Sequence, residues 1–175
     1  MADQFDLKSL LDALIYAESN NDPMAVSDVG AAGLTQMMPA TAIKPRDDVR
    51  NVFDRAQERG YDFPDRTPAT AQGLLFDPDI SYLMGDDYLR AMIDLTGGDM
   101  DRALAAYNWG PTNALKWNGQ FDSLPVQSQD YIPKIRAKYE DLTGSPLPTT
   151  GTYGTQRVTS PRPMPRPMGL LEMTQ

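Results

Sequence analysis

One carboxyl group in the sequence has surroundings suited to acid catalysis. Glu18 ends an apolar series formed by Leu7, Leu11 and Leu14, with spacings of four, three and four residues. At about 100° per residue these positions share one face of a helix. A carboxyl group beside an apolar wall has its charged form disfavoured, which raises its pKa. Such an acid can deliver a proton to a leaving oxygen at neutral pH, as cleavage of a glycosidic bond requires. The competing interpretation is a solvated acid at a helix end.

A glycine-containing loop and a polar pair follow this acid. The loop includes Gly30 and Gly33, and the pair is Thr35 and Gln36. An isolated carboxyl group held against a glycine-rich turn is what cleavage of a glycosidic bond needs. This combination of residues favours a sugar-cleaving site.

Two stretches of the sequence resemble motifs of the soluble lytic transglycosylase family. The first starts at Glu18-Ser19 and continues through Gly30-Ala31-Ala32-Gly33-Leu34-Thr35-Gln36-Met37-Met38-Pro39-Ala40-Thr41-Ala42. The second is Ala103-Leu104-Ala105-Ala106-Tyr107-Asn108-Trp109-Gly110-Pro111. Between them, Asp77-Pro78 with Gly85 and Tyr88-Leu89 resembles the linking helix, and residues 124–132 resemble the last motif. The resemblance spans roughly residues 7–142.

The resemblance implies a mainly α, lysozyme-like helical domain that acts on peptidoglycan. Family members cleave the β-1,4 bond between N-acetylmuramic acid and N-acetylglucosamine with one acid, which Glu18 matches. That acid protonates the glycosidic oxygen, and it or its conjugate base takes the proton of the muramoyl 6-hydroxyl, which closes a 1,6-anhydro ring. One alternative is a hydrolytic muramidase in which Asp22 or Asp28 positions a water. Another is a structural or adaptor virion protein that keeps the fold with little activity.

The resemblance also implies five substrate-binding residues. Ser27, Gln36 and Met38 match residues that line the sugar site near the acid. Tyr107 matches a tyrosine whose hydroxyl lies close to the acid, and Asn108 follows it in the same motif. Plainer interpretations are a turn residue for Ser27, core filler for Met38 and a helix-packing aromatic for Tyr107.

The sequence departs from the family pattern at several positions. Thr35 replaces a usual Met, Ser81 replaces a usual Asn, and Gln127 replaces a Glu that often helps to hold the peptide stem. Residues 43–74 form a longer connection than is usual, rich in charged residues and containing proline. This connection has three interpretations: a lid over the sugar groove, a docking surface, or a solvated loop with one short helix.

The composition limits the chemistry and the partners. The 175 residues include no Cys and no His, which excludes thiol chemistry, an imidazole base and a His metal site. We therefore expect no cofactor and no metal. The formal charge of −8 argues against nucleic acid as a partner. The expected partner is the glycan strand of peptidoglycan.

The N-terminal residues predict how the chain reaches the wall. No signal segment and no membrane span is visible. We therefore expect a phage virion, in its tail or among its ejected proteins, to deliver the chain to the host periplasm or cell wall. The alternative is an exported bacterial protein from which the signal has been removed.

The pattern predicts a catalytic domain over residues 1–143 and a Pro-rich, extended tail over residues 144–175. Asp3 or Asp6 is expected to cap the first helix, Asp99 is expected to cap a later one, and Pro133 is expected to kink or split the last. The tail, with three arginines and one glutamate, is interpreted as a strap that docks on another virion protein, or as a disordered end. Helices are predicted near residues 5–18, 34–43, 79–95, 100–108, 111–117 and 126–142.

Overall fold

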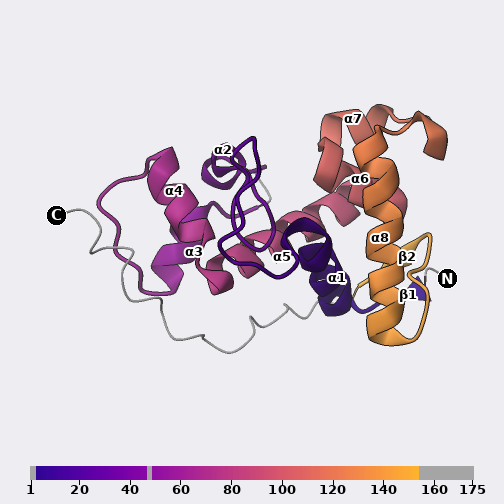
Figure 1. Ribbon diagram of the computed structural model, residues 1–175, viewed down its shortest axis with the longest axis horizontal. Coiled ribbons are helices and arrows are strands. Elements are labelled where there is room, and N and C mark those ends of the chain that lie inside the picture. Colours follow the sequence, from indigo (N-terminus) through magenta and orange to yellow (C-terminus); the bar gives the residue numbers. More distant parts are fainter. Residues whose placement is uncertain (1–2, 47–48, 154–175) are drawn as a thin grey trace. The chain divides into compact units, whose positions relative to one another are not determined.

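A computed structural model describes residues 3–46 and 49–153. Within this part of the chain there are two compact units: residues 3–17 with 88–153 form unit 1, and residues 18–46 with 49–87 form unit 2. The chain passes from one unit to the other within two helices, α1 and α5 (Figure 1). The elements are β1 (Asp3–Gln4), α1 (Leu7–Ser19), α2 (Pro39–Ile43), α3 (Val52–Glu58), α4 (Pro68–Leu75), α5 (Pro78–Leu95), α6 (Met100–Trp109), α7 (Pro111–Lys116), the 3-10 turn η1 (Phe121–Ser123), α8 (Val126–Thr143) and β2 (Gly151–Thr152).

The mainly helical fold predicted from the sequence is confirmed, with one shortened helix. The helix expected over 34–43 begins only at Pro39, because the preceding residues form backbone bridges. Ala32 bridges to Met37, and Gln36 has a left-handed backbone with φ 46°. An L-residue in that conformation cannot continue a right-handed helix.

Helix ends follow the capping residues in the sequence. The Asp6 carboxylate accepts hydrogen bonds from the backbone N–H groups of Lys8 and Ser9, at 3.2 and 3.3 Å. Asp99 caps α6 by accepting from the backbone N–H of Arg102 at 3.0 Å. Both carboxylates thus satisfy N–H groups that have no partner inside the helix. Pro133 was expected to kink or split the last helix; the helix is not split, because α8 continues through Pro133 to Thr143.

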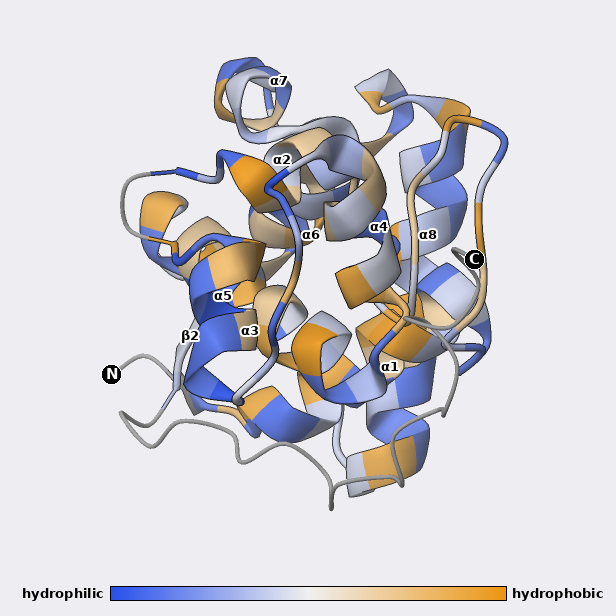
Figure 2. Ribbon diagram, turned by 90° about the vertical axis from the view of Figure 1, so that its left-hand side faces the viewer, coloured by the Kyte–Doolittle hydropathy of each residue, from blue (hydrophilic) through white to orange (hydrophobic). Residues whose placement is uncertain are grey.

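The core of unit 1 is built around α6. Small side chains at Ala103, Ala105 and Ala106 are buried, and α7 and α8 both contact this helix. Figure 2 shows hydrophobic and hydrophilic residues on the same helices, as expected for helices that bury one side.

Residues 147–153 pack with unit 1, although the sequence placed them in the tail. β2 pairs in parallel with β1, and the side chain of Leu147 is buried. Arg136 on α8 donates from Nη1 to the Leu147 carbonyl at 2.6 Å and from Nε to Asp101 at 2.7 Å. These contacts place the segment with the helical body. The rest of the predicted tail, residues 154–175, lies outside the described residues.

Tyr153 fixes the end of this segment. Its hydroxyl donates to the Asp94 carboxylate at 2.8 Å, and its ring meets Phe5 edge-on with centroids 6.1 Å apart. The Arg90 guanidinium lies 4.9 Å from the ring centre. Burial, with the hydrogen bond to Asp94, raises the pKa of Tyr153 to about 12. The hydroxyl therefore remains a donor at neutral pH.

The connection over 43–74 is a packed part of unit 2. Val52 and Phe53 on α3 are buried, and α3 contacts α4. Arg55, only 5% exposed, makes an ion pair with Asp87 on α5, and Nε of Arg55 donates to that carboxylate at 2.8 Å. Tyr61 donates to Asp77, the residue that caps α5. The interpretation as a solvated loop with one short helix is therefore wrong: the connection has two helices and a buried ion pair.

The contacts of residues 147–153 generate a prediction about truncation. A chain that ends at Gly144 should have a lower thermal midpoint than a chain that ends at Tyr153. Burying a leucine side chain stabilises by about 1.5–3 kcal/mol, and each hydrogen bond adds roughly 1 kcal/mol. We expect a loss of about 5 °C or more in the thermal midpoint, followed by circular dichroism. Equal midpoints for the two truncations would show that the segment does not stabilise unit 1.

Candidate active site

The predicted acid lies in the last turn of α1. The apolar face that precedes it is buried as expected, through Leu7, Leu10, Leu11 and Leu14. Glu18 itself is half-buried and is the first residue of unit 2. In the chain, Glu18 thus follows the buried face of α1 and precedes the loop.

The chain reverses direction immediately after the acid. Asn20 and Asn21 both have left-handed backbones, with φ 53° and 65°. Asparagine adopts this conformation more readily than most residues, because its short amide can bond to nearby backbone. The backbone N–H of Asp22 then donates to the Ser19 carbonyl at 3.0 Å. Two consecutive asparagines therefore end α1 and begin the loop.

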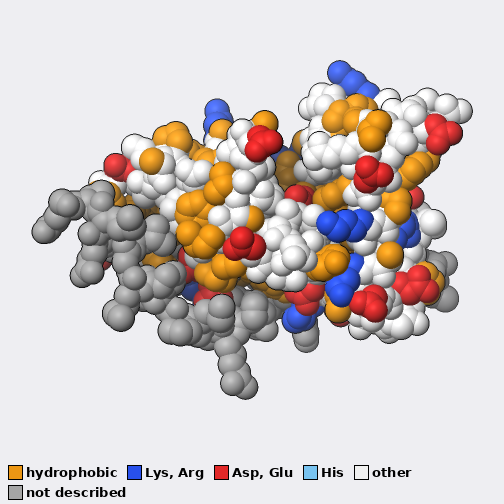
Figure 3. Space-filling view, viewed as in Figure 1, with side chains coloured by type: hydrophobic (Ala, Val, Ile, Leu, Met, Phe, Trp, Pro, Cys, Tyr) orange, Lys and Arg blue, Asp and Glu red, His pale blue; other side chains and the backbone are white. Residues whose placement is uncertain are grey.

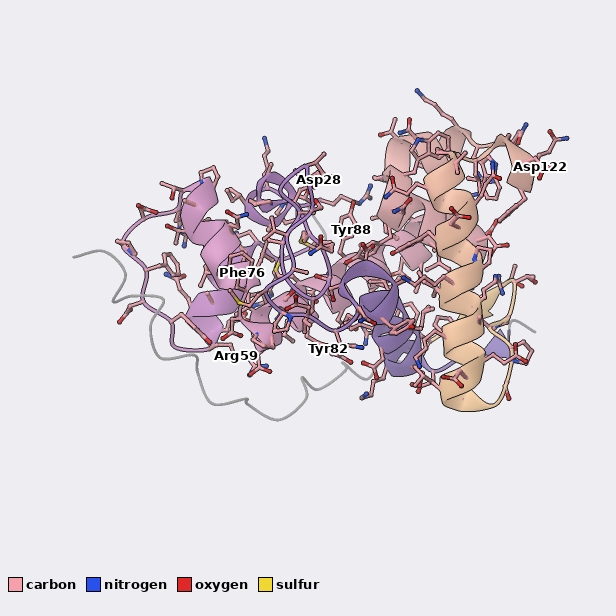
Figure 4. All side chains as sticks on the ribbon, viewed as in Figure 1. Asp28, Arg59, Phe76, Tyr82, Tyr88 and Asp122 are labelled. Atoms are coloured by element: carbon pink, nitrogen blue, oxygen red, sulfur yellow. The ribbon has the colours of Figure 1, made fainter. Side chains whose placement is uncertain are left out.

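The loop over 25–37 is held by its own backbone. Val26 bridges to Ala32, and Ala32 bridges to Met37. Ser27 closes the turn between them, because its Oγ accepts from the Ala31 N–H at 3.0 Å. This role agrees with the plainer interpretation of Ser27 as a turn residue. Asp28 follows at the exposed side of the turn (Figure 4).

At Gly33 the loop lies too close to α4 and α5 for a side chain to fit. Gly33 has φ 76°, and a Cβ built on it would lie 1.9 Å from the Leu75 carbonyl oxygen and 2.9 Å from Ser81 Oγ. Real Cβ atoms do not approach other atoms so closely, so only glycine fits here without movement of α4 or α5. Gly30, by contrast, has φ 87° and nothing near its Cβ position.

Two departures from the family pattern contact each other in unit 2. Thr35 and Ser81 are both fully buried, and Thr35 Oγ1 lies 3.2 Å from the Ser81 carbonyl and 3.3 Å from Ser81 Oγ. The Thr35 N–H also donates to Ser81 Oγ at 3.3 Å. Each hydroxyl thus provides a partner for the other in a buried setting, where an unpaired one is costly. The pair joins the loop to α5 beside Gly33.

Gln36 uses its amide inside the loop. Nε2 donates to the carbonyls of Ala25 and Gly33, at 3.0 and 2.9 Å. Since both partners are carbonyls, which only accept, the amide nitrogen must face them. The same residue has the left-handed backbone described above, so its side chain offsets a local strain of about 1 kcal/mol or more. The structure therefore gives Gln36 a loop-holding role, and its Oε1 has no hydrogen-bond partner within the described residues.

The two methionines of the loop have different environments. Met37 is buried, whereas Met38 is 39% exposed. Core filler therefore describes Met37 and not Met38. Met24, Val26 and Val29 are also exposed, so the loop presents several apolar side chains to solvent.

Tyr107 and Asn108 belong to unit 1, on α6. Tyr107 is half-buried and meets Tyr88 edge-on, with ring centroids 5.2 Å apart (Figure 4 labels Tyr88). Asn108 accepts a hydrogen bond from the buried Ser128 on α8, at 2.9 Å. The structure thus brings Ser27, Gln36 and Met38 together in the loop after Glu18, and places Tyr107 and Asn108 among the packing contacts of unit 1.

Sequence reasoning did not identify the partners of these residues. Ser128 lies twenty positions from Asn108, and Ser81 lies far from Thr35 in sequence, so spacing indicated neither pair. The consecutive asparagines could have indicated the end of α1, because asparagine directly after an apolar helix is typical of a helix end.

Among residues 3–46 and 49–153, no cluster of three or more Cys, His, Asp or Glu side chains is arranged to hold a metal ion. The described helices include none that is both long enough and apolar enough to span a membrane.

The helical fold, with a half-buried acid before a loop locked by glycine, defines a small lysozyme-like helical domain. The chain belongs to the family described as Transglycosylase SLT domain, whose profile matches residues 3–129. It is 32% identical over 136 residues to the soluble lytic murein transglycosylases of Escherichia coli K12 and of Salmonella typhimurium. That alignment covers 71% of this chain and 19% of each relative, so the chain spans about one fifth of their length.

Solved structures agree on the fold. An inactive variant of the lytic transglycosylase Slt from Pseudomonas aeruginosa gives a TM-score of 0.59 at 22% identity, over 81% of this chain and 23% of that one. The 70 kDa soluble lytic transglycosylase from Escherichia coli gives 0.58 at 25% identity, over 79% and 22%. The predicted lysozyme-like helical fold is therefore confirmed.

The close approach at Gly33 generates a matched pair of predictions. Gly30→Ala should destabilise by about 1–2 kcal/mol, because only the left-handed backbone opposes it. Gly33→Ala should cost about 3 kcal/mol or more, since the overlap with Leu75 adds an overpacking cost. Urea unfolding of both variants measures the difference. Similar losses for the two variants would mean that the loop is not held against α4 as described.

The amide contacts of Gln36 generate a second prediction. Gln36→Met keeps the length of the side chain but removes two hydrogen bonds, so it should destabilise by about 1–3 kcal/mol. We expect the variant to lose thermal stability together with activity, because the loop loosens. Thermal melting and cleavage of wall sacculi are measured on the same preparation. If stability is unchanged and only substrate affinity falls, Gln36 acts through the substrate alone and the loop-holding role is wrong.

Proposed function

We propose that this chain is a peptidoglycan lytic transglycosylase that cleaves the β-1,4 bond between N-acetylmuramic acid and N-acetylglucosamine. The observation that supports it most is the position of Glu18, half-buried at the end of a buried leucine face and followed by a loop with no room for a side chain at Gly33. Membership of the SLT domain family and the names of the relatives agree with this activity.

Glu18 performs both proton transfers in the proposed reaction. Its protonated carboxyl gives a proton to the glycosidic oxygen while the bond from that oxygen to the muramoyl C1 breaks. The resulting carboxylate takes the proton of the C6 hydroxyl, whose oxygen bonds to C1 and forms the 1,6-anhydro ring. No water is consumed, and Glu18 ends the cycle protonated. The chain has no His that could act as an alternative base.

The other predicted site residues contribute in different ways. We propose that Met38 contacts sugar directly, because its side chain is exposed beside the loop. Ser27 and Gln36 act mainly by shaping the loop, since their side chains bond to its backbone. Tyr107 and Asn108 are proposed to bind substrate on the basis of the family motif.

A hydrolytic muramidase is the alternative chemistry. It requires a second carboxylate to position a water, as in inverting enzymes. Asp22 accepts a hydrogen bond from the Met24 N–H at 2.9 Å and so serves the turn after the acid. Asp28 is exposed. Mass spectrometry of the digest separates the two reactions, because an anhydro product is lighter than a hydrolysed one by one water molecule.

The carrier and protein partners are a further part of the proposal. We propose that the Pro-rich residues 154–175, with three arginines and one glutamate, dock on another virion protein, and that a phage delivers the chain to the wall. Proline restricts the backbone of a free chain, so a Pro-rich sequence loses less entropy on docking. A chain that ends at Tyr153 should then cleave sacculi normally but be missing from purified particles. Its normal presence in particles would contradict the docking role.

The proposal predicts the effect of a single isosteric change. Glu18→Gln keeps the size of the side chain but removes the transferable proton. General acid–base catalysis contributes about 10²–10⁴-fold, and one residue provides both transfers here, so cleavage of sacculi should fall by at least about 10⁴-fold. Circular dichroism confirms that the variant is folded. A folded variant that clears sacculi at about a tenth of the normal rate or faster would exclude Glu18 as the acid, because losing general acid–base catalysis should cost about 100-fold or more.

A further inference from the structure

Unit 1 has a hollow that the proposed reaction does not use. It has a volume of about 250 Å³ and is lined by Trp109, Asn113, Lys116, Trp117, Asn118 and Ser123. None of these residues belongs to the loop after Glu18. Figure 3 shows hydrophobic atoms at the surface over α7, the helix that supplies two of the lining residues. We propose that this hollow binds an N-acetylated sugar ring of a glycan strand, as a docking site for the wall.

The indole of Trp117 is held in one orientation. Nε1 donates to the Gln120 carbonyl at 2.9 Å and to Ser123 Oγ at 3.0 Å. The Arg102 guanidinium lies over the ring, 5.3 Å from its centre, and donates to the carbonyls of Ala114 and Trp117. A half-buried aromatic ring that is already fixed loses little entropy when a ligand stacks on it.

The turn around this ring is held by hydrogen bonds within it. Asn118 Oδ1 accepts from the Gln120 N–H at 2.9 Å and from Ser123 Oγ at 2.8 Å. These bonds connect the residues of the turn over 117–123, which includes Asp122 (Figure 4), next to the hollow.

Two side chains of α7 provide polar groups at the edge of the hollow. Asn113 donates from Nδ2 to the Trp109 carbonyl at 2.9 Å, and within the described residues its Oδ1 accepts no hydrogen bond. Lys116 is exposed and makes no ion pair in the described part of the chain, although the chain as a whole is strongly acidic. An amide oxygen and an ammonium group thus lie next to indole rings.

This set of groups fits a sugar better than other ligands. A pyranose ring has an apolar face that stacks on indole and a polar edge that bonds to amide and ammonium groups. An apolar peptide would leave Asn113 and Lys116 without partners, which costs binding energy. A nucleic acid requires several basic side chains, whereas this hollow has one. A wall glycan has N-acetylated rings and carboxylates, which match the indole and the ammonium group.

The inference extends the proposed function, since it assumes that the chain acts on wall glycan. Both tryptophans of the chain line the hollow, so intrinsic tryptophan fluorescence reports on it. The test uses the Glu18→Gln variant, which does not cleave, titrated with a soluble tetramer of N-acetylglucosamine. We expect a saturable change in tryptophan emission.

Variants of the hollow provide the comparison. Asn113→Ala with Lys116→Met, in the Glu18→Gln background, removes two polar contacts, and we expect the affinity to fall about tenfold. Lys44→Met, an exposed lysine of unit 2, removes the same charge outside the hollow and should leave the affinity unchanged. Co-sedimentation with wall sacculi should agree: Glu18→Gln alone and Glu18→Gln with Lys44→Met should bind equally well, and Glu18→Gln with the two changes in the hollow should bind more weakly.

The outcomes separate this inference from the proposed function. The docking site is refuted if the folded Glu18→Gln variant shows no saturable change in tryptophan emission. The hydrogen bonds around Trp117 would then only stabilise the turn. The docking site is also refuted if the Asn113→Ala, Lys116→Met variant binds as tightly as the control. If the unaltered chain fails to cleave sacculi, the proposed reaction is wrong, but the titration still decides whether the hollow binds sugar.

Discussion

The conformation of the loop after Glu18 depends on Gly33, where the backbone comes so close to its neighbours that a side chain would not fit. At Gly33 the backbone approaches the Leu75 carbonyl so closely that a Cβ would overlap it, and that Cβ would also lie 2.9 Å from Ser81 Oγ. This approach places Thr35 where its hydroxyl meets Ser81, and it leaves the Gly33 carbonyl available to the Gln36 amide. This close approach holds the loop near α4 and α5. The backbone bridges and the side-chain hydrogen bonds can then form, because they connect segments that are already close.

Three polar residues of the candidate site form hydrogen bonds within the protein. Ser27 closes a turn, Gln36 bonds to two loop carbonyls, and Asn108 bonds to Ser128 on α8. A carboxyl group that transfers protons needs fixed surroundings, because catalysis depends on groups that are already oriented when the reaction begins. A residue of the motif can thus matter through the protein contacts that it makes, whether or not it also binds substrate.

The sequence was informative about elements and less so about contacts. The leucine spacing predicted α1 and its buried face, and Asp6 and Asp99 marked two helix starts, because these signals act within a few residues. The helix expected to start at residue 34 was too long, since the left-handed backbone of Gln36 is stabilised by carbonyls that periodicity does not register. The packing of Leu147 and the ion pair of Arg55 with Asp87 were missed for the same reason: each joins residues distant in the chain.

The parallel pairing of β1 with β2 has a consequence for how such a unit is used in larger proteins. Asp3 is paired with Gly151, so the first and last described strands lie side by side, about 4.8 Å apart. Unit 1 therefore begins and ends at the same edge. A body of this kind can be spliced into a surface loop of a host chain through short linkers, or circularly permuted, without opening its core. In the relatives, the matching region makes up 19% of a longer chain.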